Sequence, residues 1–190
     1  MYKPYSPEKI REFENEISTF FKRNEITLIP NMDLTATCIG LGFSMFSMEL
    51  PKDIDGIILA NKFVKKIGIS NKLGLKDARR VIAHELSHYI HHLSEVGDSS
   101  KLVVALKDNI LHDNKKTDLE NQMDYMAAAI LVPMDSFIEE LRGLGIKGIT
   151  KIEQVRDQVE KIKINYLATL YEVDADLIER RIVEACTYVG

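Results

Sequence analysis

The stretch His84-Glu85-Leu86-Ser87-His88 decides how this sequence is interpreted, because it has the pattern H-E-x-x-H. It lies between about Lys76 and Leu93, where apolar residues recur at the spacing of an amphipathic helix. Residues four apart lie one above the other on a helix, so His84 and His88 can bind one metal ion. Glu85 can then reach a water bound to that ion and act as general base. The alternative interpretation is a histidine-rich helix face exposed to solvent.

A catalytic zinc site needs a third protein ligand, whose position differs between peptidase families. The extended metzincin pattern is excluded, because His91 and Ser94 occupy the positions of its glycine and its third histidine. Glu120 and Asp124 lie four apart in a later predicted helix, where Glu120 can bind the metal. Asp124, on the same face, can accept the other ring N–H of a histidine ligand. Alternatively, Glu120 closes a capping box by bonding the backbone N–H of Thr117.

Composition limits the class of protein. A chain of 190 residues with 45% hydrophobic and 28% charged residues favours one domain, or one domain with a small appendage. A formal net charge of −4 argues against broad binding to nucleic acid or to an anionic membrane. We expect a cytoplasmic protein without a membrane span, because no apolar run approaches ~20 residues and no signal-peptide pattern is present. Cys38 and Cys186 are far apart, which argues against a disulfide scaffold or a cysteine zinc site.

Periodicity and turn signals predict an α+β protein, with a few strands in the first third and helices afterwards. Strands are expected at residues 26–29 and 57–60, with an irregular strand or bulged hairpin at 39–48. Helices are expected at about residues 7–23, 76–93, 102–111, 117–131 and 134–141. Two further helices are expected after residue 151, separated near residues 173–174.

The two motifs together resemble the ImmA/IrrE family of bacterial and phage-encoded metallopeptidases. The residues that carry the resemblance are His84-Glu85-Leu86-Ser87-His88, His92, Gly56-Ile57-Ile58-Leu59-Ala60-Asn61, and the segment from Glu120 to Pro133. The last of these is similar to the family signature E-x-E-A-N/D-x-F-A-A-x-L-L-M-P. The departures from the family's usual residues are Ser87, Gln122, Met123 and Met126. None of them removes a ligand or the base, so they leave only the choice of substrate open.

The resemblance implies a cytoplasmic, zinc-dependent endopeptidase with Mn²⁺ as the alternative ion. It implies a minimal zincin-like core over residues 1–142, in which a small twisted antiparallel or mixed sheet packs on a zinc-binding helix pair. Residues 143–190 would form a helical appendage. In that family the substrate is typically a helix-turn-helix transcriptional repressor, often encoded beside the peptidase. Two other functions stay open: a metal-containing binding protein that sequesters a repressor or other partner, and a zinc-stabilised helix pair without an open coordination position.

Several further residues have two interpretations each. His92, four residues past His88, is either a group that stabilises an oxyanion or a solvated side chain. The same two interpretations apply to His91. Tyr125 either donates to an oxyanion or packs in the core, and His112 is expected to be exposed. The strand at 57–60 is either an edge that pairs with substrate backbone or an ordinary core strand.

The pattern of residues 167–181 is similar to a helix-turn-helix, with Arg180 and Arg181 in the second helix. The neighbouring acids Asp174, Asp176 and Glu179 would repel phosphate, so we do not expect DNA binding. The oligomeric state cannot be predicted from these patterns.

Overall fold

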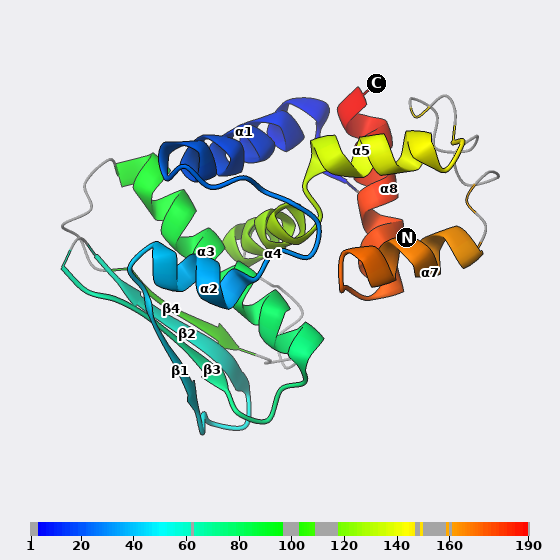
Figure 1. The fold of residues 1–190 in the computed structure, drawn as a ribbon. Helices are drawn as coiled ribbons and strands as arrows, with labels where there is room; N and C mark the ends of the chain where they lie inside the picture. The colour runs from blue at the N-terminus through cyan, green and yellow to red at the C-terminus, as the bar shows by residue number, and fades with distance from the viewer. Residues whose placement is uncertain are drawn as a thin grey trace. The chain divides into compact units, whose positions relative to one another are not determined.

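The computed structural model describes residues 4–61, 63–96, 103–108, 118–146, 149, 159 and 161–189 (Figure 1). Its helices are α1 (Pro7–Arg23), α2 (Leu34–Gly40), α3 (Leu75–Val96), α4 (Asp118–Leu131), α5 (Met134–Gly143), α7 (Lys161–Leu170) and α8 (Ala175–Val189). Its strands are β1 (Ser44–Met48), β2 (Ile54–Ala60), β3 (Lys65–Ser70) and β4 (Val103–Asp108). The predicted α+β class is therefore confirmed. The chain divides into a central unit, residues 32–127, and a terminal unit, residues 1–31 with 128–190.

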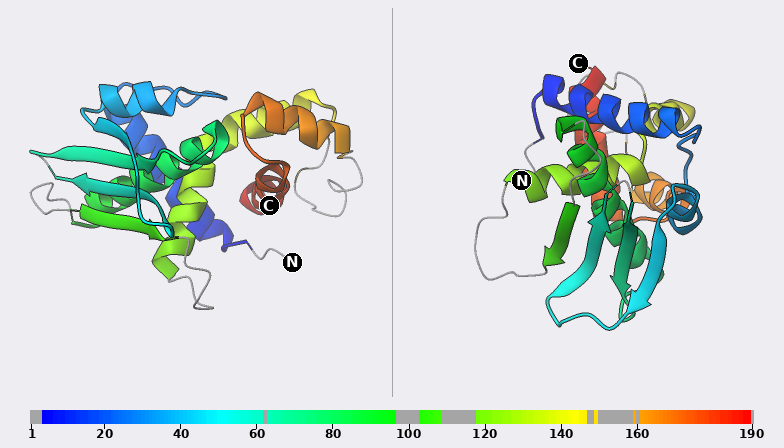
Figure 2. Two further views of the ribbon diagram at one scale, coloured as in Figure 1. Left: turned by 90° about the horizontal axis from the view of Figure 1, so that it is seen from below. Right: turned by 90° about the vertical axis from the view of Figure 1, so that its left-hand side faces the viewer.

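The central unit is built on a mixed four-stranded sheet in the order β1-β3-β2-β4. β1 runs parallel to β3, and β2 is antiparallel to both of its neighbours. Helix α3 packs against one face of this sheet and contacts β2, β3 and β4 (Figure 2). Alternation along β2 buries Gly56, Ile58 and Ala60 on the side of α3, while Ile57 and Leu59 point the other way and are less buried. A small mixed sheet packed on the histidine-bearing helix was the predicted arrangement.

The terminal unit is helical. Helix α1 begins where Ser6 Oγ accepts a hydrogen bond from the Lys9 N–H at 3.3 Å, and Pro7 occupies its first position. Its apolar face is buried. The buried residues of that face are Ile10, Phe13, Ile17 and Phe21. Helix α8 lies against α1 and α7.

The side chain of Arg181, on α8, is fully buried. Its hydrogen bonds connect α8 with α1 and with the residue that follows α4. Its Nη1 donates to Glu184 Oε2 at 2.8 Å, and its Nη2 donates to Glu14 Oε1 on α1 at 2.9 Å. Its Nη2 and Nε also donate to the carbonyl of Val132, at 2.8 and 3.1 Å. Because that carbonyl follows the last turn of α4, Arg181 satisfies an acceptor that the helix itself cannot.

Two predicted strands near the N-terminus are corrected. Ile26–Ile29 is not a strand: the Ile26 N–H donates to the carbonyl of Phe21 at 3.0 Å and closes the end of α1, and no described strand pairs with the segment. The irregular strand expected at 39–48 is shorter, because α2 occupies residues 34–40 and only β1 remains. Asp33 caps α2 by accepting from the Ala36 N–H at 2.9 Å, a start signal that the prediction missed.

Around the sheet, one prediction is wrong, one strand was missed, and one open alternative is decided. The helix expected at 102–111 is not formed, because residues 103–108 form β4 and pair with β2. Strand β3 was not predicted at all. Residues 57–60 are not a free edge, because β2 lies between β3 and β4. In each case, pairing between distant segments decides what local patterning cannot.

Among the described residues, none of the helices has the length and apolarity that crossing a membrane requires. The boundary between a domain of residues 1–142 and a helical appendage of residues 143–190 stays a prediction.

Candidate metal centre

The central unit brings two histidine rings of α3 together. His84 and His88 are one turn apart and both buried, at 1% and 7% exposure. Their ring centroids are 5.0 Å apart and their Nε2 atoms 3.2 Å apart. The helix can bury this polar pair because residues 81–90 are buried throughout, with apolar residues such as Leu86 and Ile90 contributing to the core.

Helix α4 adds a carboxylate to this pair. Glu120 Oε2 lies 3.1 Å from His84 Nε2, and its Oε1 lies 3.4 Å from His88 Nε2. One ligand atom from each of the three residues lies within 4.8 Å of the others. Asp124, one turn further along α4, places its Oδ1 2.9 Å from His84 Nδ1. The four side chains predicted from the two motifs are thus brought together.

The donor set fits a divalent metal ion. If His84 donates its Nδ1–H to Asp124, its Nε2 carries a lone pair. That lone pair then faces a second ring nitrogen and a carboxylate, an arrangement that a cation between them satisfies. Two ligands bound to tetrahedral zinc lie about 3.3 Å apart, since each is ~2.0–2.1 Å from the ion. The observed separations of 3.1, 3.2 and 3.4 Å are close to that value.

The electrostatics favour an ionised ligand at Glu120. Its hydrogen bond with His84, helped by the charges of His88 and His84, holds the pKa of the Glu120 carboxyl below its ordinary value, although burial and Asp124 act in the opposite direction. The capping box that Glu120 was alternatively expected to form involves Thr117, which lies outside the described residues.

Glu85 is fully buried, and it lies between α3 and strand β2. A Cβ atom at Gly56 of β2 would lie 2.8 Å from Glu85 Oε1 and would also collide with Val81. Gly56 therefore makes room for the Glu85 side chain under the sheet. Turn signals predicted Asp55 and Gly56 as a turn before the strand, and only the family resemblance grouped Gly56 with the strand; in the structure both residues belong to β2. The role of Gly56 beside Glu85 depends on how the strand and the helix pack together.

The remaining candidates differ in how far they are buried. Tyr125 is fully buried in α4. His92 is half-buried, and its Nε2 has no hydrogen-bond partner among the described residues. His91 is also half-buried, and His112 lies outside the described residues. The contributions of His92 and Tyr125 to an oxyanion site stay predictions.

The cysteines are not metal ligands in the described cluster. Burial raises the pKa of Cys38 to about 12 and that of Cys186 to about 11, so both thiols stay protonated at neutral pH. Neither forms a disulfide.

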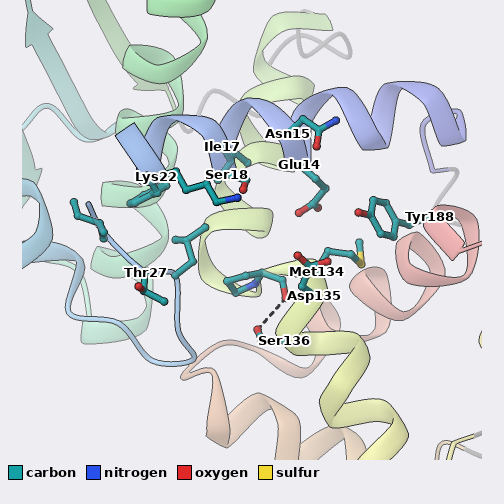
Figure 3. A pocket seen from close by; sticks show the side chains of 14 residues that line it. Glu14, Asn15, Ile17, Ser18, Lys22, Thr27, Met134, Asp135, Ser136 and Tyr188 are labelled. Atoms are coloured by element: carbon teal, nitrogen blue, oxygen red, sulfur yellow. Dashed lines mark hydrogen bonds between the residues drawn. The ribbon is translucent and has the colours of Figure 1, made fainter. Parts of the chain in front are cut away.

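The terminal unit contains a separate cavity of about 290 Å³ (Figure 3). Helix α1, residues 26–28 and the start of α5 line it, with Tyr188 at one side. None of the predicted site residues lines it. Both polar and apolar side chains line the cavity. Two of the polar ones have partners within the protein: Glu14 accepts a hydrogen bond from Arg181, and the Ser136 hydroxyl donates to the Pro133 carbonyl at 3.1 Å.

We predict that Asp124→Asn weakens metal binding about 10–100-fold, because the neutral amide no longer orients and polarises His84 as the carboxylate does. Competition with a chromophoric chelator measures the affinity. Asp118→Asn is the matched control: it removes a carboxylate from the exposed first turn of the same helix. Equal affinities of the two variants would contradict the role assigned to Asp124.

Comparison with protein-family models gives a match. A model of a peptidase family, described as the IrrE N-terminal-like domain, matches residues 50–183. The matched range includes both helices that carry the cluster. No curated protein matches the chain.

Proposed function

Since the chain belongs to the metallopeptidase family described as the IrrE N-terminal-like domain, we propose that it is a zinc-dependent endopeptidase that cleaves a helix-turn-helix repressor at a specific site. One observation carries the proposal: ligand atoms of His84, His88 and Glu120 lie within 4.8 Å of one another. Asp124 Oδ1 lies 2.9 Å from the second ring nitrogen of His84, Nδ1. In metal sites, a carboxylate in this position orients the histidine ligand.

In this proposal His84, His88 and Glu120 hold the ion. Two imidazoles and a carboxylate suit zinc, and manganese is the alternative ion. When bound, the ion would polarise the scissile carbonyl and lower the pKa of a bound water. Asp124 keeps the Nδ1 proton on His84, so that Nε2 remains a lone-pair donor.

Glu85 is the proposed proton-transfer group. Its carboxylate takes a proton from the attacking water and afterwards transfers it to the leaving amine, so that one side chain serves as base and then as acid. Gly56 supports this role by leaving the space that the Glu85 side chain occupies. His92 and Tyr125 are the candidates for stabilising the oxyanion that forms on the carbonyl.

The substrate class follows from the resemblance to peptidases that cleave repressors, and we place the protein in the cytoplasm with them. Direct binding of DNA by the chain itself is not part of the proposal. Arg181 is buried among Glu14, Glu184 and a carbonyl, and Arg180 Nε donates to Glu184 at 2.9 Å. The two arginines of the helix-turn-helix-like segment are thus engaged within the protein.

The test incubates the purified, zinc-loaded protein with the repressor encoded beside its gene and identifies fragments by mass spectrometry. We expect one cleavage site, loss of cleavage after chelation and recovery on adding zinc. Glu120→Ala should lose both zinc and cleavage, whereas Asp118→Ala should keep both. Stable binding of the repressor without fragments, with zinc retained, would instead establish a protein that sequesters its partner. If Glu120→Ala keeps full zinc affinity, Glu120 is not a ligand.

A further inference from the structure

An apolar groove lies on the sheet of the central unit, on the face opposite α3. It has a volume of about 330 Å³, and residues of β1, β2 and β3 line it. The side chains that set its chemistry are Phe46 and Met48 on β1, Ile57 and Leu59 on β2, and Lys66 and Gly68 on β3. Pockets that bind small molecules start at about 300 Å³ and combine apolar walls with a few polar groups. The groove has the size and the kind of lining that such pockets have.

Gly68 is the floor of this groove. The sheet register places it between Phe46 of β1 and Ile57 of β2, with all three on one face. A Cβ at Gly68 would lie 2.9 Å from Ile57 Cγ2 and 3.0 Å from Met48 Sδ, so a larger residue would fill the floor. β1 and β2 are two strand spacings apart, about 9–10 Å. With side chains on both walls, this width suits a narrow, linear ligand.

Lys66 gives the groove its charge. Among the described residues it is the only charged one that lines the groove. It lies two residues before Gly68 on the same face of β3, beside Leu59 in the register. Its exposed ammonium group forms no hydrogen bond or ion pair with any residue that the structure describes. The nearby carboxylate of Glu49 does not line the groove and lies 3.6 Å from the ammonium group of Lys72.

We propose that this groove binds a free fatty acid, whose acyl chain lies over Gly68 and whose carboxylate pairs with the ammonium group of Lys66. Charge complementarity carries the choice of ligand. A single cation beside an otherwise apolar lining matches a molecule with one anionic end and an apolar body. A cationic amphiphile would bring like charges together, and a neutral one would gain no ion pair with Lys66. Met48, which is 43% exposed, can adjust its flexible side chain to the acyl chain.

The size of the groove favours a small ligand over a protein partner. A standard protein–protein interface engages about 20–30 residues on each side, many more than line this groove. The inference is also independent of the proposed peptidase activity. His84 and His88 belong to α3, which packs on the other face of the sheet.

Isothermal titration calorimetry on the full chain tests the groove with three ligands that share one hydrocarbon chain: octanoate, octanol and octylammonium. We expect saturable, one-to-one binding of octanoate. Octanol should bind about two- to five-fold more weakly, the factor that a solvent-exposed ion pair contributes. Octylammonium should bind more weakly than octanol, because its charge would face Lys66.

Two variants of Lys66 test its role as the partner of the carboxylate. Lys66→Met, which keeps an apolar stem, should bind octanoate and octanol equally. Lys66→Glu should reverse the preference and bind octylammonium more tightly than octanoate. Lys52→Glu is the matched control and should behave as the wild type, because it makes the same charge change at an exposed lysine that does not line the groove.

A third variant tests the floor. Gly68→Ala should weaken the binding of octanoate and octanol alike, by about tenfold, because its methyl group occupies the floor. Gly40→Ala adds the same methyl group where the structure leaves open space, and it should not change binding. If the wild type shows no saturable binding of octanoate below the concentration at which octanoate forms micelles, the inference is wrong. It is also wrong if Lys66→Glu, a change at an exposed position, keeps the wild-type order of the three ligands.

Discussion

Glu85→Gln is expected to reduce peptide hydrolysis by about 10²–10⁴-fold while zinc binding is retained. Glutamine has nearly the same shape as glutamate and fills the space beside Gly56, but it cannot accept a proton from water. The loss should appear in the turnover of the proposed repressor substrate, because the variant keeps the proposed metal ligands His84, His88 and Glu120.

The measurement combines single-turnover cleavage rates with zinc content by atomic emission. Glu139→Gln is the matched control, since it makes the same chemical change at an exposed position of α5. A Glu85→Gln protein that cleaves within a few-fold of the wild-type rate would show that another group is the base. If the variant loses its zinc together with its activity, Glu85 supports the site structurally.

Arg181→Met should lower the free energy of unfolding by about 3–5 kcal/mol. The substitution keeps much of the volume but leaves the fully buried Glu184 carboxylate without its bond to Nη1 and the Val132 carbonyl without its donor. Buried groups deprived of a partner retain the full cost of leaving water, which explains why this effect exceeds that of an exposed ion pair.

Urea denaturation followed by circular dichroism measures this change. Arg180→Met is the matched control, because Arg180 also bonds Glu184 but is 25% exposed. We expect it to cost less than Arg181→Met, since Glu184 keeps its bond to Arg181 Nη1 in that variant. Similar losses for the two variants would contradict the central position assigned to Arg181. Neither residue belongs to the metal cluster, so zinc affinity should change little in folded Arg181→Met protein.

Much of the helical structure could be predicted because its signals are local. Ser6 and Pro7 marked the start of α1, and the apolar spacing around His84 and His88 marked α3. The sheet was harder. β3 and β4 are short, and whether they form depends on their pairing with β2. No window of sequence around residue 105 contains the partner that turned an expected helix into a strand.

The residues of the candidate site could be predicted from local patterns: two histidines four apart on a helix, a carboxylate beside them, and an E-x-x-x-D pair on a later helix. Each pattern lies within a single helix, where the 3.6-residue repeat sets which side chains share a face. The arrangement in space depends on the tertiary fold: Glu120 lies 3.1 Å from His84, Gly56 makes room for Glu85, Arg181 is buried, and β1 is the terminal strand of the described sheet. These facts depend on contacts between residues distant in sequence, and the free energy of such contacts comes from burial and pairing that local patterns do not encode.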